Sequence, residues 1–195
     1  MSRLPTVSDT DANAAEVFSE IKAERGYVSN ALRSLAHSPE ALRHFARLGA
    51  HIKYRSALTE RQRELVIICA AKEFEYEWKH HAPLALQAGV TPDQLDEIKE
   101  GRIPASLPAA EQALVRLVLE MFQPGSAGEE TFRRLEAHWS AQQITDLVFS
   151  ATYYHALGLI ATALGVQMES HDVLQGEQAW QKERVDAEQR ATGLK

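Results

Sequence analysis

The sequence contains a single cysteine, Cys69, among its 195 residues. One cysteine excludes an intramolecular disulfide, a Cys-x-x-Cys redox pair and a multi-cysteine metal site within one chain. Because Cys69 lies in the middle of an apolar run, we expect an inert buried side chain rather than a nucleophile. The sequence therefore assigns no chemistry to its only thiol.

Other absences exclude further classes of protein. Positive charge is scarce, since 21 Lys and Arg against 27 Asp and Glu give a net charge of -6, which excludes a basic nucleic-acid binder. No apolar stretch approaches the roughly 18 residues of a membrane span, and the first residues lack the pattern of a secretory signal. Glycine-rich phosphate loops, His-Glu-x-x-His and Gly-x-Ser-x-Gly are also missing. We expect a cytoplasmic protein with neither a nucleic-acid nor a membrane partner.

The sequence does contain apolar residues at helical spacing, and strand alternation is missing from it. We predict an all-α fold of about eight to nine helices. Thr59, Thr91 and Ser140 each precede a glutamine by three residues, which is typical of a capping box, and Ser38-Pro39 indicates another helix start. The expected helices span about 12–25, 30–36, 39–54, 59–73, 75–88, 92–100, 108–122, 128–137 and 141–165.

We expect one helical domain over residues 1–168, followed by a C-terminal tail over residues 169–195. Residues 65–71 are apolar on every side, which predicts a central helix enclosed by others. After Leu174 the tail has few large apolar residues, namely Trp180, Val185 and Leu194. Such a segment is either mobile or ordered by packing on a neighbouring subunit. In the second case the subunits can exchange their tails.

The densest group of functional side chains lies between residues 73 and 83. In a helix, Glu77 and His81 project from one face, which continues as Leu84 and so points inward. A poorly solvated carboxylate and imidazole can exchange protons near neutral pH. The alternative is a helix pair that only stabilises the core. Pro83 predicts either a bend beside this pair or the first turn of a helix that starts near His80.

Other polar residues are interpreted structurally. Glu64 begins the apolar helix, where a carboxylate interacts favourably with the helix N-terminus. His155 lies on an apolar stripe and is expected to be a hydrogen-bonded core histidine. Glu77 and His80 have the spacing of half a di-iron motif, but no second copy occurs, so we expect no metal.

The motif Tyr76-Glu77-Trp78-Lys79-His80-His81, with Arg63-Glu64-Leu65 before it and Ala88-Gly89-Val90 after it, resembles the carboxymuconolactone decarboxylase family. The resemblance is to the cysteine-free branch with a Tyr-Glu-Trp-x-x-His signature, and it covers most of residues 4–168. It implies an all-α alkylhydroperoxidase-like fold that assembles as a homotrimer or homohexamer. Redox members of the family carry Cys-x-x-Cys, where this sequence has Phe74 and Glu77. The resemblance therefore implies no thiol peroxidase activity.

The decarboxylating members of the family imply a cofactor-free lyase that acts on a small carboxylated lactone or a related organic acid of aromatic catabolism. On this resemblance we expect His81 as the proton donor, Glu77 as its orienting partner or base, and Glu64 as a supporting carboxylate. An oxyanion needs a donor, which either Tyr76 or His80 can supply. The residues expected to bind the substrate are Tyr76, Trp78, His80 and Tyr154.

Two other functions remain open from the sequence. One is a non-catalytic or differently acting oligomer that keeps the fold without the chemistry. The other is a metal-dependent oxidoreductase, whose ligands would be Glu64, Glu77, His80 and His81.

Overall fold

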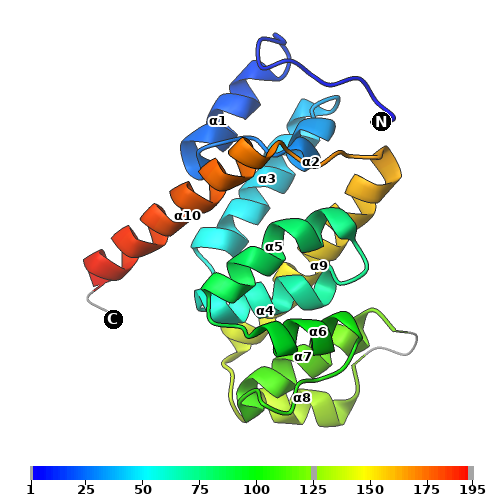
Figure 1. Cartoon of the computed structure of the whole chain (residues 1–195), viewed down its shortest axis with the longest axis vertical. Coiled ribbons are helices and arrows are strands. Elements are labelled where there is room, and N and C mark those ends of the chain that lie inside the picture. Colours follow the sequence, from blue (N-terminus) through cyan, green and yellow to red (C-terminus); the bar gives the residue numbers. More distant parts are fainter. Residues whose placement is uncertain (1, 124–126, 193–195) are drawn as a thin grey trace. The chain divides into compact units, whose positions relative to one another are not determined.

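The structure is a computed structural model that describes residues 2–123 and 127–192. Helices are the only regular elements assigned within these residues, so the predicted all-α class is confirmed (Figure 1). In chain order they are α1 (Ala15–Arg25), α2 (Asn30–Ser34), α3 (Pro39–Tyr54), α4 (Glu60–Ala70), α5 (Glu75–Gln87), α6 (Pro92–Lys99), α7 (Ala109–Met121), α8 (Glu129–Glu136), α9 (Ala141–Leu164) and α10 (His171–Thr192).

Local sequence explains where several helices begin. Thr59 and Thr91 form complete capping boxes with the glutamines three residues on, at the starts of α4 and α6. Ser140 and Gln143 exchange the same pair of bonds before α9, with distances of 3.0 and 3.2 Å. Proline occupies the first position of α3, where its missing amide proton costs no hydrogen bond. All four predicted helix starts are confirmed.

Contacts divide the chain into two compact units. The first comprises Met1–Ala50 and Leu164–Lys195, and the second is His51–Ala163. Each has its own cluster of buried apolar side chains. The predicted domain division after residue 168 stays a prediction.

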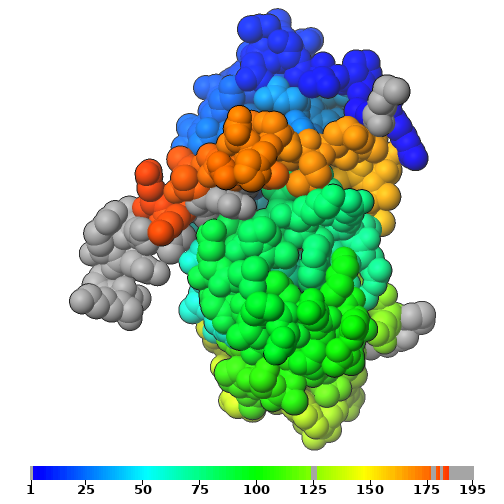
Figure 2. Space-filling view, in the orientation of Figure 1, coloured from blue at the N-terminus to red at the C-terminus, as the bar shows by residue number. Residues whose placement is uncertain are grey.

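The second unit is built around α4, which contacts α5, α6 and α7. Every residue of α4 from Arg63 to Ala70 is buried, which confirms the predicted central helix. Side chains of α5 and α6, green in Figure 2, form much of the visible face of this unit. The helix that carries Glu64 is therefore enclosed, and its polar residues lie in a poorly solvated interior.

The first unit has its core on α1, α2 and the beginning of α3, with Phe18, Leu32 and Leu42 almost completely buried. Helix α1 ends at Gly26, whose φ of +78° lies in the left-handed region. The indole of Trp180 lies 2.8 Å from the point where a Cβ on Gly26 would stand. Glycine at this position therefore both ends α1 and admits the tryptophan of α10.

Residues 171–192 of the expected C-terminal tail form the helix α10, which is missing from the predicted helices. That a neighbouring subunit orders the tail stays a prediction. The segment is rich in alanine, glutamate, glutamine, lysine and arginine, which favour a helix even without an apolar stripe. Arg184 also donates to the carbonyl of Glu24 at 2.5 Å, within the first unit. Residues 193–195 of the predicted tail lie outside the described residues.

Helix α9 corrects the expectation that no apolar segment is long enough for a membrane span. It has 24 residues, and its most apolar window has a mean hydropathy of 1.4. Asp146 is the only charged residue on it, and the tyrosines and threonines between its aliphatic residues conceal the apolar run. In this window 44% of the residues are buried inside the fold, and core helices of soluble proteins pass the same test. Helix α9 is therefore weak evidence for a membrane segment.

Candidate functional site

The predicted acid/base pair lies on α5. Because α5 runs from Glu75 to Gln87, Glu77 and His81 are one turn apart inside a single helix. Pro83 also lies inside this helix, so the alternative that it opens a helix near His80 is wrong. Having no amide proton, Pro83 cannot donate to the carbonyl of Lys79, four residues earlier. The helix therefore loses a backbone bond two residues beyond His81.

Close packing brings the start of α5 against α9. A Cβ placed on Gly158 would lie 2.3 Å from the ring of Phe74, the residue that precedes α5. Only a residue without a side chain permits this approach. Tyr154 is one turn before Gly158 on α9, and its ring meets the ring of His81 edge-on, with centroids 4.8 Å apart. The close contact at Gly158 thus helps to place the ring of Tyr154 beside the imidazole of His81.

The imidazole of His81 lies between two buried carboxylates from different helices. Its Nδ1 is 2.9 Å from Oε2 of Glu64, and its Nε2 is 3.8 Å from Oε2 of Glu77. The side chains of Glu64 and Glu77 are 0% and 2% exposed, and that of His81 is 7% exposed. An ionised carboxylate only accepts hydrogen bonds, so Nδ1 carries a proton and donates it to Glu64. This leaves Nε2 as the nitrogen available for proton exchange.

The electrostatic setting keeps Glu64 ionised. Complete burial on its own would raise the pKa of this carboxyl group. The charge of His81, its hydrogen bond and the charges of Arg63 and Lys53 outweigh burial, and they hold the pKa of Glu64 below its ordinary value of 4.5. Glu64 is therefore a carboxylate throughout the neutral range.

Four residues were predicted to bind substrate, and the structure places them differently. Tyr154 lies against His81, as described. Tyr76 and His80 are both buried and pack on each other, with ring centroids 4.6 Å apart. Trp78 is half-buried beneath the ammonium group of Lys99, which lies 4.3 Å from the ring centroid. The geometry thus groups Tyr154 with the acid/base residues, whereas Trp78 contacts a lysine instead.

Two residues kept out of the predicted site behave as the sequence indicates. His155 bonds to the carbonyl of Ala70 at 3.2 Å and stacks on Phe122, which confirms the predicted hydrogen bond, although the side chain is only partly buried rather than in the core. Cys69 is buried on α4, and burial raises the pKa of its thiol far above neutrality. The thiol of Cys69 is therefore protonated at neutral pH and is a poor nucleophile.

The sequence analysis missed two buried cations of the site. Arg63 is 7% exposed and Lys53 is 5% exposed, and the charges of both act on Glu64. Arg63 precedes Glu64 directly, so burial of the whole segment was the signal that could have revealed it. Lys53 lies near the end of α3, and no local pattern connects it to Glu64, which is eleven residues later in the sequence.

The site is defined by buried side chains rather than by one of the larger hollows. Three cavities of about 280, 110 and 360 Å³ have walls that include none of Glu64, Glu77 and His81. Within the described ranges, no group of three or more His, Cys, Asp or Glu side chains has a geometry suited to a metal ion. The proposed metal ligand set of Glu64, Glu77, His80 and His81 therefore has no geometric support.

Solved structures identify the fold. An uncharacterized peroxidase-related protein with an alkylhydroperoxidase AhpD core, from Ralstonia eutropha JMP134, has a TM-score of 0.72 and 20% identity over 87% of this chain and 93% of that chain. A similar protein from Silicibacter sp. TM1040 has a TM-score of 0.71 and 17% identity over 87% and 92%. The debrominase Bmp8, in complex with 2,3,4-tribromopyrrole, has a TM-score of 0.69 and 17% identity over 94% and 99%. The chain thus has the alkylhydroperoxidase-like fold.

Part of the chain matches a family model. Residues 39–120 match the model of the carboxymuconolactone decarboxylase family, which supports that family for this segment. The match includes Glu64, Glu77 and His81, and it confirms the resemblance predicted from their motif. No curated protein sequence matches the chain significantly.

Proposed function

We propose that this protein is a cofactor-free lyase that decarboxylates a small carboxylated lactone or a related organic acid of aromatic catabolism. The observation that carries the proposal is the buried His81, hydrogen-bonded to Glu64 on one side and facing Glu77 on the other. The match of residues 39–120 to the carboxymuconolactone decarboxylase family supports the substrate class. The absence of a Cys-x-x-Cys pair separates this chain from a thiol peroxidase.

The proposed reaction requires one proton donor. When the bond to the carboxylate carbon breaks, its electron pair stays on the substrate and is delocalised into an adjacent carbonyl, while CO2 leaves. Protonated His81 then gives its Nε2 proton to the resulting carbanion. A proton from solvent restores the imidazolium. No oxidant or reductant is needed.

The geometry favours a revised division of roles between the two glutamates. Glu64 makes the 2.9 Å bond to Nδ1, so we assign it the orienting role that the sequence analysis expected of Glu77. Glu77 stands 3.8 Å from Nε2, beyond normal hydrogen-bond length, where it stabilises the imidazolium by charge. Tyr76, His80 and Tyr154 remain proposed substrate contacts.

The test measures CO2 release and the ultraviolet change with 4-carboxymuconolactone and a panel of related lactone acids. We expect turnover by the wild type and a loss of about 10²- to 10⁴-fold in His81→Ala, because general acid catalysis contributes this much. His138→Ala is the matched control, since His138 is an exposed histidine of the same unit. A folded His81→Ala protein with full turnover would contradict the assignment.

The same preparation distinguishes the alternative functions. No turnover on the whole panel, with a normally folded wild type, favours the non-catalytic or differently acting oligomer. Elemental analysis of protein purified without chelator tests the metal-dependent oxidoreductase. A stoichiometric transition metal that is lost in Glu64→Gln and His81→Ala would favour that function over the lyase.

A further inference from the structure

Arg63 is a buried cation that makes no ion pair and no hydrogen bond through its Nε with any residue that the structure describes. Its side chain lies on α4 and is 7% exposed. Its Nε is inaccessible to solvent and has no hydrogen-bond partner. Within residues 2–123 and 127–192, no carboxylate forms an ion pair with its guanidinium group.

This arrangement is unusual because taking an ion out of water is costly unless the ion is paired and hydrogen-bonded. Arg61, two residues earlier on the same helix, shows the usual solution. It makes two bonds to Glu111, of 2.8 and 3.0 Å. Arg63 lacks such a partner although its charge acts on the neighbouring Glu64. A guanidinium held in this state is preorganised for an anion that the fold does not supply.

A second observation places the open position next to the acid/base pair. Glu64 uses Oε2 for His81, whereas its Oε1 is buried without a hydrogen-bond partner. Adjacent buried residues of α4 thus carry an unused donor and an unused acceptor, and the charge of Arg63 acts on Glu64. A ligand with both an anionic group and a hydroxyl or protonated oxygen can satisfy both.

We propose that Arg63 binds a carboxylate of the small-molecule ligand beside the Glu64–His81 pair, which makes the site selective for organic acids. The planar guanidinium matches the two oxygens of a carboxylate and can bind them bidentately. Arg63 is thus a binding and specificity residue, and it takes no proton in the reaction. The choice of an organic acid as ligand rests on the proposed function, but the test below does not require turnover.

The proposal has a consequence for the ligand-free protein. If Arg63 is kept for a ligand, the cost of burying its guanidinium without a hydrogen-bonded partner is offset in the empty site only by its attraction to Glu64. Methionine has a similar length and no charge, so Arg63→Met should unfold at the same or a higher temperature than the wild type. A purely structural arginine predicts the opposite, because its removal would lower the unfolding temperature.

The experiment measures the unfolding temperature of the full chain with benzoate, with the uncharged isostere benzamide and with inorganic phosphate, at constant ionic strength. We expect benzoate to raise the unfolding temperature of the wild type and benzamide to leave it unchanged. Arg63→Met should lose the benzoate response. Arg63→Lys keeps the charge but not the planar guanidinium with its paired N–H donors, so it should retain part of the response. Arg116→Met is the control, since Arg116 is 42% exposed on α7 and should respond as the wild type does.

The proposal would be overturned by a benzoate response that persists in Arg63→Met, by an equal response to benzamide, or by no response of the wild type to benzoate. A phosphate response as large as the benzoate response would show a site for oxyanions in general rather than for carboxylates. This result would also overturn the proposal. The proposed lyase activity fails separately. A folded wild type without turnover, whose benzoate response depends on Arg63, contradicts the lyase but supports the binding role. Normal turnover with an unchanged KM in Arg63→Met supports the lyase but contradicts the binding role of Arg63.

Discussion

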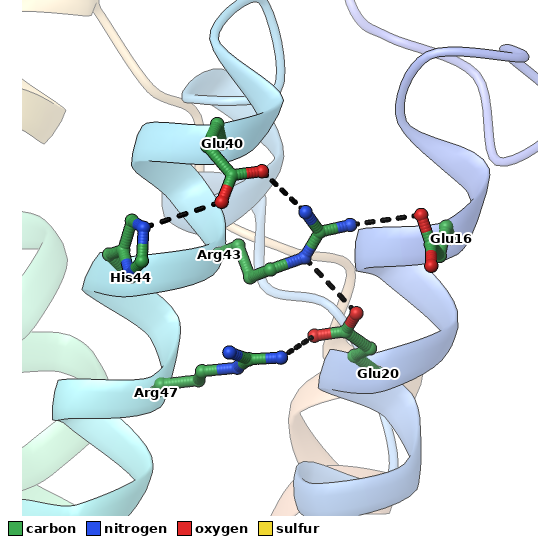
Figure 3. A network of polar contacts seen from close by, with 6 residues as sticks. All are labelled: Glu16, Glu20, Glu40, Arg43, His44 and Arg47. Atoms are coloured by element: carbon green, nitrogen blue, oxygen red, sulfur yellow. Dashed lines mark hydrogen bonds and ion pairs between the residues drawn. The ribbon is translucent and has the colours of Figure 1, made fainter.

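Two clusters of carboxylates and cations illustrate opposite uses of charge. In the first unit, Arg43 of α3 contacts Glu16 and Glu20 of α1 and Glu40 of its own helix, and Glu20 also bonds to Arg47 (Figure 3). In the second unit, Glu64 and Glu77 flank His81 in the interior. The first cluster lies near solvent, where Glu16 is 81% exposed and Glu40 is 67% exposed. The second is almost completely shielded from solvent.

The difference shows where charge can do chemistry. At the surface Arg43 is fully paired by neighbouring glutamates, and water screens each interaction. In the interior one imidazole nitrogen is held by Glu64 and the other has no hydrogen bond of normal length. Low solvation makes each charge act more strongly on its neighbours. The surface network therefore joins two helices, whereas the buried cluster leaves one nitrogen of His81 without a hydrogen bond of normal length.

The largest effect on stability is expected for Glu64→Gln. The variant keeps an acceptor for His81 but loses the charge, so we expect the free energy of unfolding at pH 7 to fall by about 1–3 kcal/mol. Because the pKa of Glu64 is lower in the folded chain than its ordinary 4.5, the ionised form stabilises the fold above pH 4.5. This stabilisation is lost as the pH falls through the folded pKa. Urea unfolding across this range should show the difference from the wild type shrinking in acid. A constant difference would contradict the assignment to the charge.

A smaller effect, of a different kind, is expected for Arg43→Gln. The variant removes the shared cation of the surface network, and we expect a modest decrease in unfolding temperature at low salt. In about 1 M salt the screening length is near 3 Å, so this decrease should disappear. Thermal unfolding at both salt concentrations measures it. The Glu64→Gln difference serves as the control, because a buried pair is much less screened. A salt-independent Arg43 effect would contradict the comparison.

The smallest effect is expected for His44→Gln, at the edge of the same network. His44 is 73% exposed and lies 3.3 Å from Glu40, which already contacts Arg43. We expect a change within about 0.5 kcal/mol in the free energy of unfolding, as for most surface substitutions. Chemical denaturation measures the free energy of unfolding of this variant and of His81→Ala. The two values compare an exposed with a buried histidine–glutamate contact. A larger loss in His44→Gln would show that the outer network is cooperative.

Local signals in the sequence predicted most of the fold. Capping residues located the starts of α4, α6 and α9 because each satisfies amide groups of its own first turn. The unbroken apolar run of residues 65–71 identified the enclosed α4, since a helix that is apolar on every side has to be covered by others. The last helix was missed because a polar helix with high intrinsic propensity leaves no periodic trace.

The candidate site was predicted less completely because its contacts are tertiary. The spacing of Glu77 and His81 within one helix indicated a shared face, and α5 provides it. Seventeen residues separate His81 from Glu64, and no helical spacing relates them, so only the packing of α4 on α5 reveals the bond. The missing partner of Arg63 is likewise invisible without the fold. The homotrimer or homohexamer and the cytoplasmic location stay predictions.

The single cysteine, Cys69, is a natural probe of local opening of the fold. Its sulfur lies on the same helix as Glu64, 2% exposed and protonated at neutral pH. A thiol reagent can react there only while the surrounding helices are open. Because the chain has no other cysteine, the modification rate reports the opening frequency of α4 without competing signals. The residue to which we assign no chemistry can therefore reveal how often the helix at the centre of the site comes apart from its neighbours.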